Sequence, residues 1–179
     1  FWATQSREPV RHYEHKEIGY NYRMSNISAG IGRGQLKVLD DRISKKTEIY
    51  ETYKDAFKEI PEIKMQPYLE NSKPNHWLST IILDKNSKVK PLDIIEKLDK
   101  ENIETRPIWK PMHMQPIYRL NPFIIKDGNG RARTNAYIEN KITDVGMDIF
   151  SRGLCLPSDN KMTVEQQDRI IEMIHCCFE

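Results

Sequence analysis

The chain has 179 residues, of which 38% are hydrophobic, so it is long enough to bury one core. Its 28 Lys and Arg residues nearly balance its 26 Asp and Glu residues, and this charge of +2 argues against nucleic acid or an anionic membrane as a partner. No apolar run approaches the roughly 20 residues of a membrane span. The cysteines are odd in number and two are adjacent, a poor disulfide framework, so we expect a cytoplasmic protein.

Residues 1–24 are aromatic and basic and show no clean period, so we expect an arm or loop there. His12 and His15 stand three apart and invite a metal interpretation. Such a pair needs at least one or two further ligands to hold zinc, and no Cys or third His lies nearby. We therefore expect no metal site in this segment.

The longest helical pattern of the chain follows this segment, and Ser25 or Asn26 can cap its first turn. Apolar residues recur mostly three or four apart at Ile27, Ile31, Leu36, Leu39, Ile43, Tyr50, Tyr53 and Phe57. One unbroken helix over 25–60 would span on the order of 50 Å and connect two bodies. Glycines at 30, 32 and 34 each weaken a helix, so we expect another backbone to pack closely against them.

Residues 61–179 predict a small α+β domain. Residues 61–74 are expected to form a connecting segment that can include a short edge strand. A helix is expected from Pro91 to about Asn102. A three-stranded sheet is expected from His76–Leu83, Ile103–Pro107 and Gly153–Leu156. Thr163 to Gln166 form a capping box that opens the last helix, and residues 127–133 are typical of a surface turn.

Asn21 and Arg23 lie just before the long helix, whose first N–H groups and positive dipole end can attract an anion. They supply one neutral and one charged hydrogen-bond donor. The alternative is an ordinary capped helix with Tyr20 and Tyr22 packed beneath it. The residue types alone leave both interpretations open.

Three stretches carry a resemblance to a known family. Residues 13–26 read YEHKEIGYNYRMSN and are followed by Gly34-Gln35-Leu36; residues 104–116 read ETRPIWKPMHMQP; residues 153–158 read GLCLPS. In this order they resemble the DegT/DnrJ/EryC1/StrS family of sugar aminotransferases, which use pyridoxal phosphate (PLP). The resemblance implies the small C-terminal domain of a fold-type I PLP enzyme. In that family the cofactor-binding lysine lies upstream of the segment matched by residue 1, so we expect the C-terminal part of a longer protein.

The resemblance also implies roles for individual residues. Asn21 is expected on the PLP phosphate of a neighbouring subunit in a homodimer, and Arg23 on the anionic part of a nucleotide-sugar. Arg106, His113 and, by position only, Trp109 are expected to contact the substrate. Each has a structural alternative: Arg106 can be a strand-end residue in a surface ion pair, and His113 a packed histidine.

The activity implied is transfer of an amino group from glutamate to a nucleotide-linked keto sugar for surface glycan synthesis. The loop around Trp109 favours a UDP-linked 4-keto-6-deoxy amino sugar, and a dTDP-linked sugar stays open. Further alternatives are a PLP-dependent dehydratase of the same family and a non-catalytic interaction module. The resemblance places the catalytic lysine upstream, so no catalytic residue is expected in this chain. Lysines such as Lys45, Lys46 and Lys85 stand in charged, solvated settings where the amine is protonated and a poor Schiff-base former. We expect the chain alone to be inactive.

Overall fold

The computed structural model describes residues 1–11, 14–118, 121–123, 132–133 and 144–179. The chain divides into two compact units, Phe1–Arg42 (unit 1) and Ile43–Glu179 (unit 2). Its helices are α1 (Asn26–Leu36), α2 (Leu39–Phe57), α3 (Pro91–Asp99), α5 (Val145–Arg152) and α6 (Val164–His175), with short 3-10 turns η1 (Met112–Met114) and η2 (Pro116–Tyr118). Its strands are β1 (Ile63–Met65), β2 (Ser79–Leu83), β3 (Arg106–Pro107), β4 (Pro122–Phe123), β5 (Ala132–Arg133) and β6 (Gly153–Leu156).

The main sheet of unit 2 has four antiparallel strands in the order β1-β2-β6-β3. Its centre is β6, which is buried along its whole length, and Ile81 of β2 lies opposite Leu154 of β6. All three predicted strands are present, although β3 covers only Arg106–Pro107 of the expected Ile103–Pro107, and β1 adds a fourth at the edge. Strand β2 begins at Ser79 instead of His76, because His76 adopts a positive φ of 44° that breaks the extended backbone.

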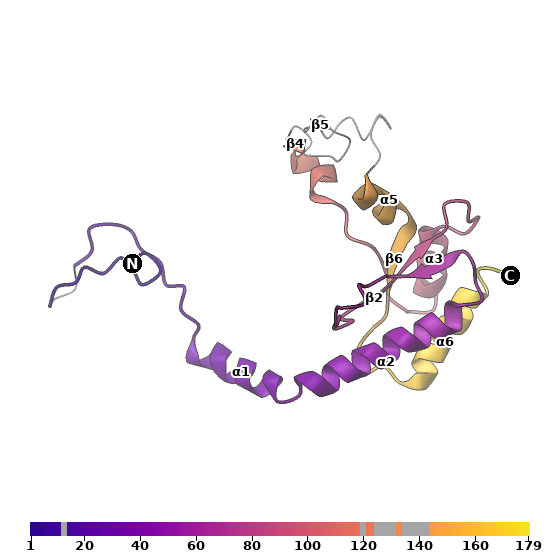
Figure 1. The fold of residues 1–179 in the computed structure, drawn as a ribbon, viewed down its shortest axis with the longest axis horizontal. Coiled ribbons are helices and arrows are strands. Elements are labelled where there is room, and N and C mark those ends of the chain that lie inside the picture. The colour runs from indigo at the N-terminus through magenta and orange to yellow at the C-terminus, as the bar shows by residue number, and fades with distance from the viewer. Residues whose placement is uncertain (12–13, 119–120, 124–131, 134–143) are drawn as a thin grey trace. The chain divides into compact units, whose positions relative to one another are not determined.

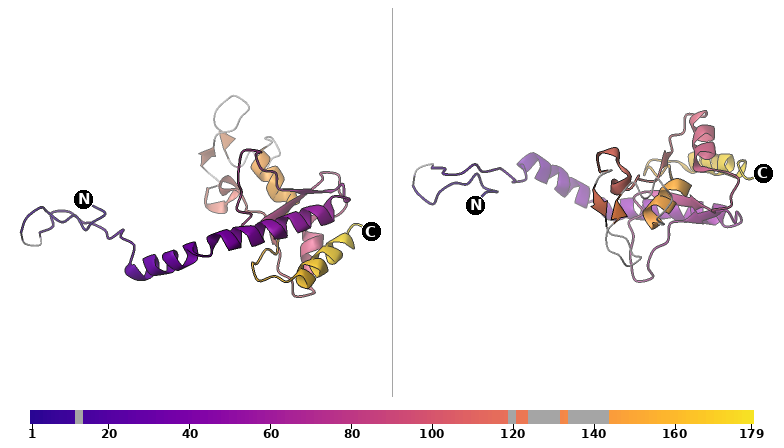
Figure 2. Two further views of the ribbon diagram at one scale, coloured as in Figure 1. Left: turned by 60° about the horizontal axis from the view of Figure 1, so that its bottom comes forward. Right: turned by 90° about the horizontal axis from the view of Figure 1, so that it is seen from above.

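Helices α2, α3 and α6 supply the helical side of the core. Ile49, Tyr53 and Phe57 stand four residues apart and form the buried face of α2. Gln167 of α6 donates a hydrogen bond to the carbonyl of Ile49, which ties these two helices together. Figures 1 and 2 show α5 on the side of the sheet away from α2 and α6. The α+β class predicted from the sequence is confirmed.

The helix expected over 25–60 is in fact two helices, with a turn at Lys37 and Val38 between α1 and α2. The amides of both turn residues donate to carbonyls three residues back, those of Gly34 and Gln35, so the helical ladder is interrupted there. The division into compact units also falls within α2, after Arg42. Residues 43–57 therefore belong to the domain that was expected to begin at residue 61.

Local signals placed other boundaries correctly. Thr163 Oγ1 accepts from the amide of Gln166, whose side chain accepts from the amide of Thr163, so the predicted capping box opens α6. A Cβ atom at Gly153 would lie 2.7 Å from the backbone oxygen of Ile149 and 2.3 Å from Ile108 Cδ1, so glycine is favoured where α5 passes into β6. The surface turn expected at 127–133 lies mostly outside the described residues; only its end, in β5, is seen.

Candidate functional site

The segment expected to be an arm forms a small hairpin within unit 1. Residues Thr4 and Asn21 face each other in an antiparallel bridge, and the amide of Tyr20 donates to the carbonyl of Trp2 at 2.8 Å. The two chain segments approach so closely at Gly19 that a Cβ atom there would lie 2.1 Å from the carbonyl carbon of Gln5. The hairpin thus needs glycine at this position, and it fixes the backbone that carries Asn21.

Asn21 and Arg23 are both exposed and lie next to the first turn of α1. Asn21 Oδ1 accepts from the amide of Arg23 at 3.2 Å, so the Asn21 side chain presents its Nδ2 group as a hydrogen-bond donor. Ser25 is the N-cap, since its Oγ accepts from the amide of Ser28, and the first turn contains no acidic residue. This arrangement can donate hydrogen bonds to an anion such as a phosphate.

Tyr20 and Tyr22 do not pack beneath α1, contrary to what is expected for an ordinary capped helix. Their rings stack on each other at 5.4 Å and remain 54% and 73% exposed. No residue of α1 is buried, and a Cβ atom at Gly30 would meet nothing within 4 Å. The close backbone expected against the glycines is therefore not supplied by the described part of this chain.

In unit 2, His113 lies in η1 and faces the start of α5. Its Nε2 is 2.8 Å from Asp144 Oδ2, and both side chains are largely buried, with 20% and 16% exposed. Asp144 is also the N-cap of α5, because its Oδ1 accepts from the amide of Met147 at 2.8 Å. His113 thus lies against a carboxylate that is itself fixed by a helix.

Arg106 lies at the end of the sheet and forms a surface ion pair, as expected if its role is structural. Its Nη2 lies 2.5 Å and its Nε 2.7 Å from Glu104 Oε1, and both side chains are more than 70% exposed. An exposed pair of this kind contributes at most about 1 kcal/mol, so a stronger anionic ligand can displace Glu104. The substrate role of Arg106 stays a prediction.

Trp109 stacks on Trp77, with ring centroids 5.4 Å apart and planes 26° from parallel. Sequence reasoning assigned Trp77 to a strand and gave it no role. It also missed Asp144, although an Asp directly before a helical pattern is a usual N-cap signal. No local signal pointed to Trp77, because its partner is 32 positions away in the chain.

Lys46 is not solvated as expected. Its Nζ donates to the carbonyl of Trp77 at 3.0 Å and to the carbonyl of Ser158. Burial lowers the pKa of Lys46, and the nearby carboxylate of Asp159 opposes that effect. Two carbonyl acceptors favour the protonated ammonium, so the amine serves as a structural donor here.

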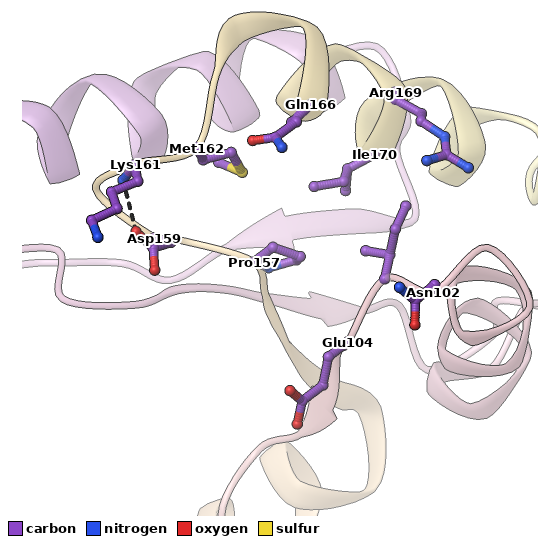
Figure 3. Close-up of a pocket in the computed structure, with 10 residues that line it drawn as sticks. Asn102, Glu104, Pro157, Asp159, Lys161, Met162, Gln166, Arg169 and Ile170 are labelled. Atoms are coloured by element: carbon purple, nitrogen blue, oxygen red, sulfur yellow. Dashed lines mark hydrogen bonds between the residues drawn. The ribbon is translucent and has the colours of Figure 1, made fainter.

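A cavity of about 480 Å³ lies between the residues after α3 and the start of α6 (Figure 3). Glu104, Asp159, Lys161 and Arg169 line it, and the amide of Lys161 donates to Asp159 Oδ1. None of the predicted site residues lines this cavity. The structure groups Asn21 with Arg23 in unit 1, and places Arg106, Trp109 and His113 in unit 2.

Further observations restrict other kinds of site. Within the described ranges, no three His, Cys, Asp or Glu residues gather in a way that could hold a metal ion, and His12 falls outside those ranges. None of the helices that the structure describes has the length and apolarity to cross a bilayer. Cys155, Cys176 and Cys177 are all free thiols.

Comparison with known proteins places this chain in a family. The model of the DegT/DnrJ/EryC1/StrS aminotransferase family matches residues 3–175. The chain belongs to this family, as the three sequence stretches predicted. Helicobacter pylori PseC, an aminotransferase involved in the biosynthesis of pseudoaminic acid, has a similar fold: its TM-score is 0.73 at 22% identity over 99% of this chain and 44% of PseC.

Several sequence relatives have names that state an aminotransferase or a sugar synthase. EpsN of Bacillus subtilis (strain 168), whose name describes a pyridoxal phosphate-dependent aminotransferase, is 41% identical over 97% of this chain and 41% of its own length. GDP-perosamine synthase of Escherichia coli O157:H7 is 32% identical over 92% of this chain and 39% of its own length. The chain thus spans about two fifths of the length of these relatives. These descriptions do not favour the dehydratase alternative.

Proposed function

We propose that this chain is the C-terminal part of a PLP-dependent aminotransferase that moves an amino group from glutamate to a nucleotide-linked keto sugar, in surface glycan synthesis. A UDP-linked 4-keto-6-deoxy amino sugar is the favoured acceptor. The family match over residues 3–175 carries the proposal. When bound, PLP supplies an electron sink; the remainder of the full-length protein contributes most of its binding site.

Asn21 holds the PLP phosphate in this proposal. The Arg23 amide donates a hydrogen bond to Asn21 Oδ1, which leaves Nδ2 as the donor, and an uncharged donor beside a helix N-terminus suits a phosphate oxygen. The hairpin contact at Gly19 keeps the Asn21 backbone in place. The residues present therefore fit a phosphate group.

Arg23 and Arg106 bind the anionic diphosphate of the nucleotide-sugar, each with a planar guanidinium that can pair two oxygens. Arg106 exchanges its exposed contact with Glu104 for the ligand. His113 is oriented by Asp144 and positions an oxygen of the sugar.

A shared active site explains the exposed surface of unit 1. Ile18, Tyr22 and Ile27 are 85%, 73% and 77% exposed, and α1 buries none of its residues. Apolar surface of this extent is unfavourable in water and marks an interaction site. We infer that a neighbouring subunit covers it in a homodimer, the commonest closed assembly. Sedimentation velocity of the full-length protein at low concentration measures its oligomeric state. A monomer that retains aminotransferase activity at that concentration would contradict the shared active site.

The central experiment is turnover by the full-length protein with PLP, glutamate and a UDP-4-keto-6-deoxy amino sugar, followed by mass spectrometry of the sugar product. We expect a mass consistent with replacement of the keto oxygen by an amino group, and stoichiometric 2-oxoglutarate.

Substitution Arg23→Ala should raise KM for the nucleotide-sugar by about 10- to 100-fold while KM for glutamate changes little. Arg11→Ala is the matched control, an exposed arginine of the same unit. Equal effects on both substrates would assign Arg23 a structural role.

The chain alone should not carry out the reaction. Lys46 is engaged by carbonyls, and the cofactor lysine is proposed to lie in the remainder of the protein. Incubation of residues 1–179 with PLP and borohydride should leave no single modified lysine in a peptide map. One stoichiometric site in this chain would mean that the catalytic lysine has been misplaced.

A further inference from the structure

Two tryptophans of unit 2 form an exposed stacked pair. Trp77 precedes β2 and Trp109 follows β3, and their rings lie within the centroid range of favourable offset stacking. Trp77 is still 60% exposed and Trp109 57% exposed. Both indoles thus keep much of their surface in water although each is partly covered by the other.

The backbone of Trp77 is fixed from several sides. Its amide donates to Asn75 Oδ1 at 3.2 Å, and its carbonyl accepts from Lys46 Nζ at 3.0 Å. The preceding residue, His76, is only 4% exposed and stacks on Tyr50 with ring centroids 4.1 Å apart. A buried aromatic neighbour therefore anchors the exposed indole.

Trp109 is anchored through the central strand. The amide of the preceding residue, Ile108, donates to the carbonyl of Gly153 at 3.2 Å, which continues the pairing of β3 with β6. The Ile108 side chain also fills the space that a Cβ at Gly153 would take. The backbone that carries each indole is therefore fixed and the two rings stack on each other, which reduces the ordering cost of binding.

We propose that Trp77 and Trp109 form a stacking platform for the base of the nucleotide-sugar, an inference that rests on the proposed function. Aromatic faces bind nucleobases by stacking regardless of base identity, because every base has a π-face. Trp109 also belongs to the same short segment as Arg106 and His113, the residues assigned to the diphosphate and the sugar.

The test is isothermal titration of the full-length protein with UDP, GDP and inorganic diphosphate. Trp77→Ala and Trp109→Ala should each weaken UDP binding roughly tenfold, the scale of one base stacked on an aromatic side chain, and leave diphosphate binding within twofold. Trp109→Phe should retain most of the UDP affinity. Leu92→Ala, which removes a 60% exposed apolar side chain from α3, is the control and should change neither.

UDP and GDP serve as separate arms, because the relatives include GDP-perosamine synthases. A loss with both nucleotides, or with the preferred one, supports the platform. Equal losses for UDP and diphosphate would overturn it, since a general structural defect does not discriminate between ligands with and without a base. Unchanged nucleotide binding together with a changed oligomeric state would also overturn it, in favour of a protein contact.

The two proposals fail in different ways. Turnover by the wild-type protein with unchanged UDP affinity in both alanine variants removes the platform and leaves the proposed function intact. Base-dependent UDP binding without transamination of any nucleotide-linked keto sugar supports the platform and removes the proposed reaction.

Discussion

All buried hydrophobic side chains that the structure describes lie in unit 2, between Ile49 and Ile174, whereas α1 in unit 1 buries no residue. Unit 2 is held by a core of strands β1, β2 and β6 with helices α2, α3 and α6. Unit 1 is held by backbone bridges and short polar contacts. Because burial of apolar surface supplies most of the stability of a fold, unit 2 has a source of stability that α1 in unit 1 does not have by itself.

The largest expected effect contrasts the two units directly. Phe57→Ala removes a ring that is 1% exposed and stacked on Tyr53, so it should lower the free energy of unfolding by about 3–5 kcal/mol. Ile27→Ala, at a 77% exposed position of α1, should change it by less than about 0.5 kcal/mol. Urea titration of residues 1–179 followed by circular dichroism measures both. Similar losses would show that unit 1 has a core of its own.

The second prediction concerns the glycines of unit 1. Gly19→Ala places a methyl group onto the backbone of Gln5 and should weaken the hairpin by about 1–3 kcal/mol, seen as faster hydrogen exchange of the Gln5 and Tyr20 amides. Gly30→Ala, in open space, should instead stabilise α1 by about 1 kcal/mol in the chain alone.

The effect of Gly30→Ala is expected to differ between the chain alone and the full-length protein. If another backbone packs against α1 there, Gly30→Ala should weaken the dimer, which sedimentation at decreasing concentration would detect. If alanine at positions 30, 32 and 34 does not change the dissociation of the dimer, then no other backbone packs closely against these glycines.

The third prediction tests how unit 2 fixes a site residue. Asp144→Ala removes both the cap of α5 and the partner of His113, and should cost about 1–2 kcal/mol. Asp144→Asn keeps an oxygen for the cap and should cost less than half as much. Thermal unfolding at several pH values compares them. Equal losses would mean that the charge of Asp144, and not the cap, carries the stabilisation.

The smallest expected effect is a pH dependence in unit 2. Burial lowers the pKa of His76 below its ordinary 6.5; Glu51 opposes this effect and Lys54 adds to it. The unfolded chain therefore takes up this proton first, so the stabilisation is complete above pH 6.5 and is lost as the pH falls below it, by at most about 1.4 kcal/mol per pH unit.

His76→Asn is the matched variant, because asparagine tolerates the positive φ of this residue and does not titrate. Urea titrations at pH 7.5 and 5.5 should show a smaller loss in the variant than in the wild type. An equal loss in both would assign the pH dependence to other groups.

Local sequence signals determined much of this protein. The capping box at Thr163, the strand at Gly153–Leu156 and the family stretches depend on neighbours within a few residues, and all three predictions were confirmed. The roles of Asn21 and Arg23, which rest on a local motif as well, stay predictions. Such features can be recognised in the sequence because caps, strand alternation and turns are made by residues close together in the chain.

Only the tertiary structure decided the contacts between distant segments. It joined Trp77 to Trp109 and His113 to Asp144, and it gave Lys46 a carbonyl partner 112 positions away at Ser158. It also divided the long helix at Lys37 and Val38, although the apolar spacing continues across that turn. Spacing fixes which face of a segment is apolar, but the packing of the whole chain determines what that face meets.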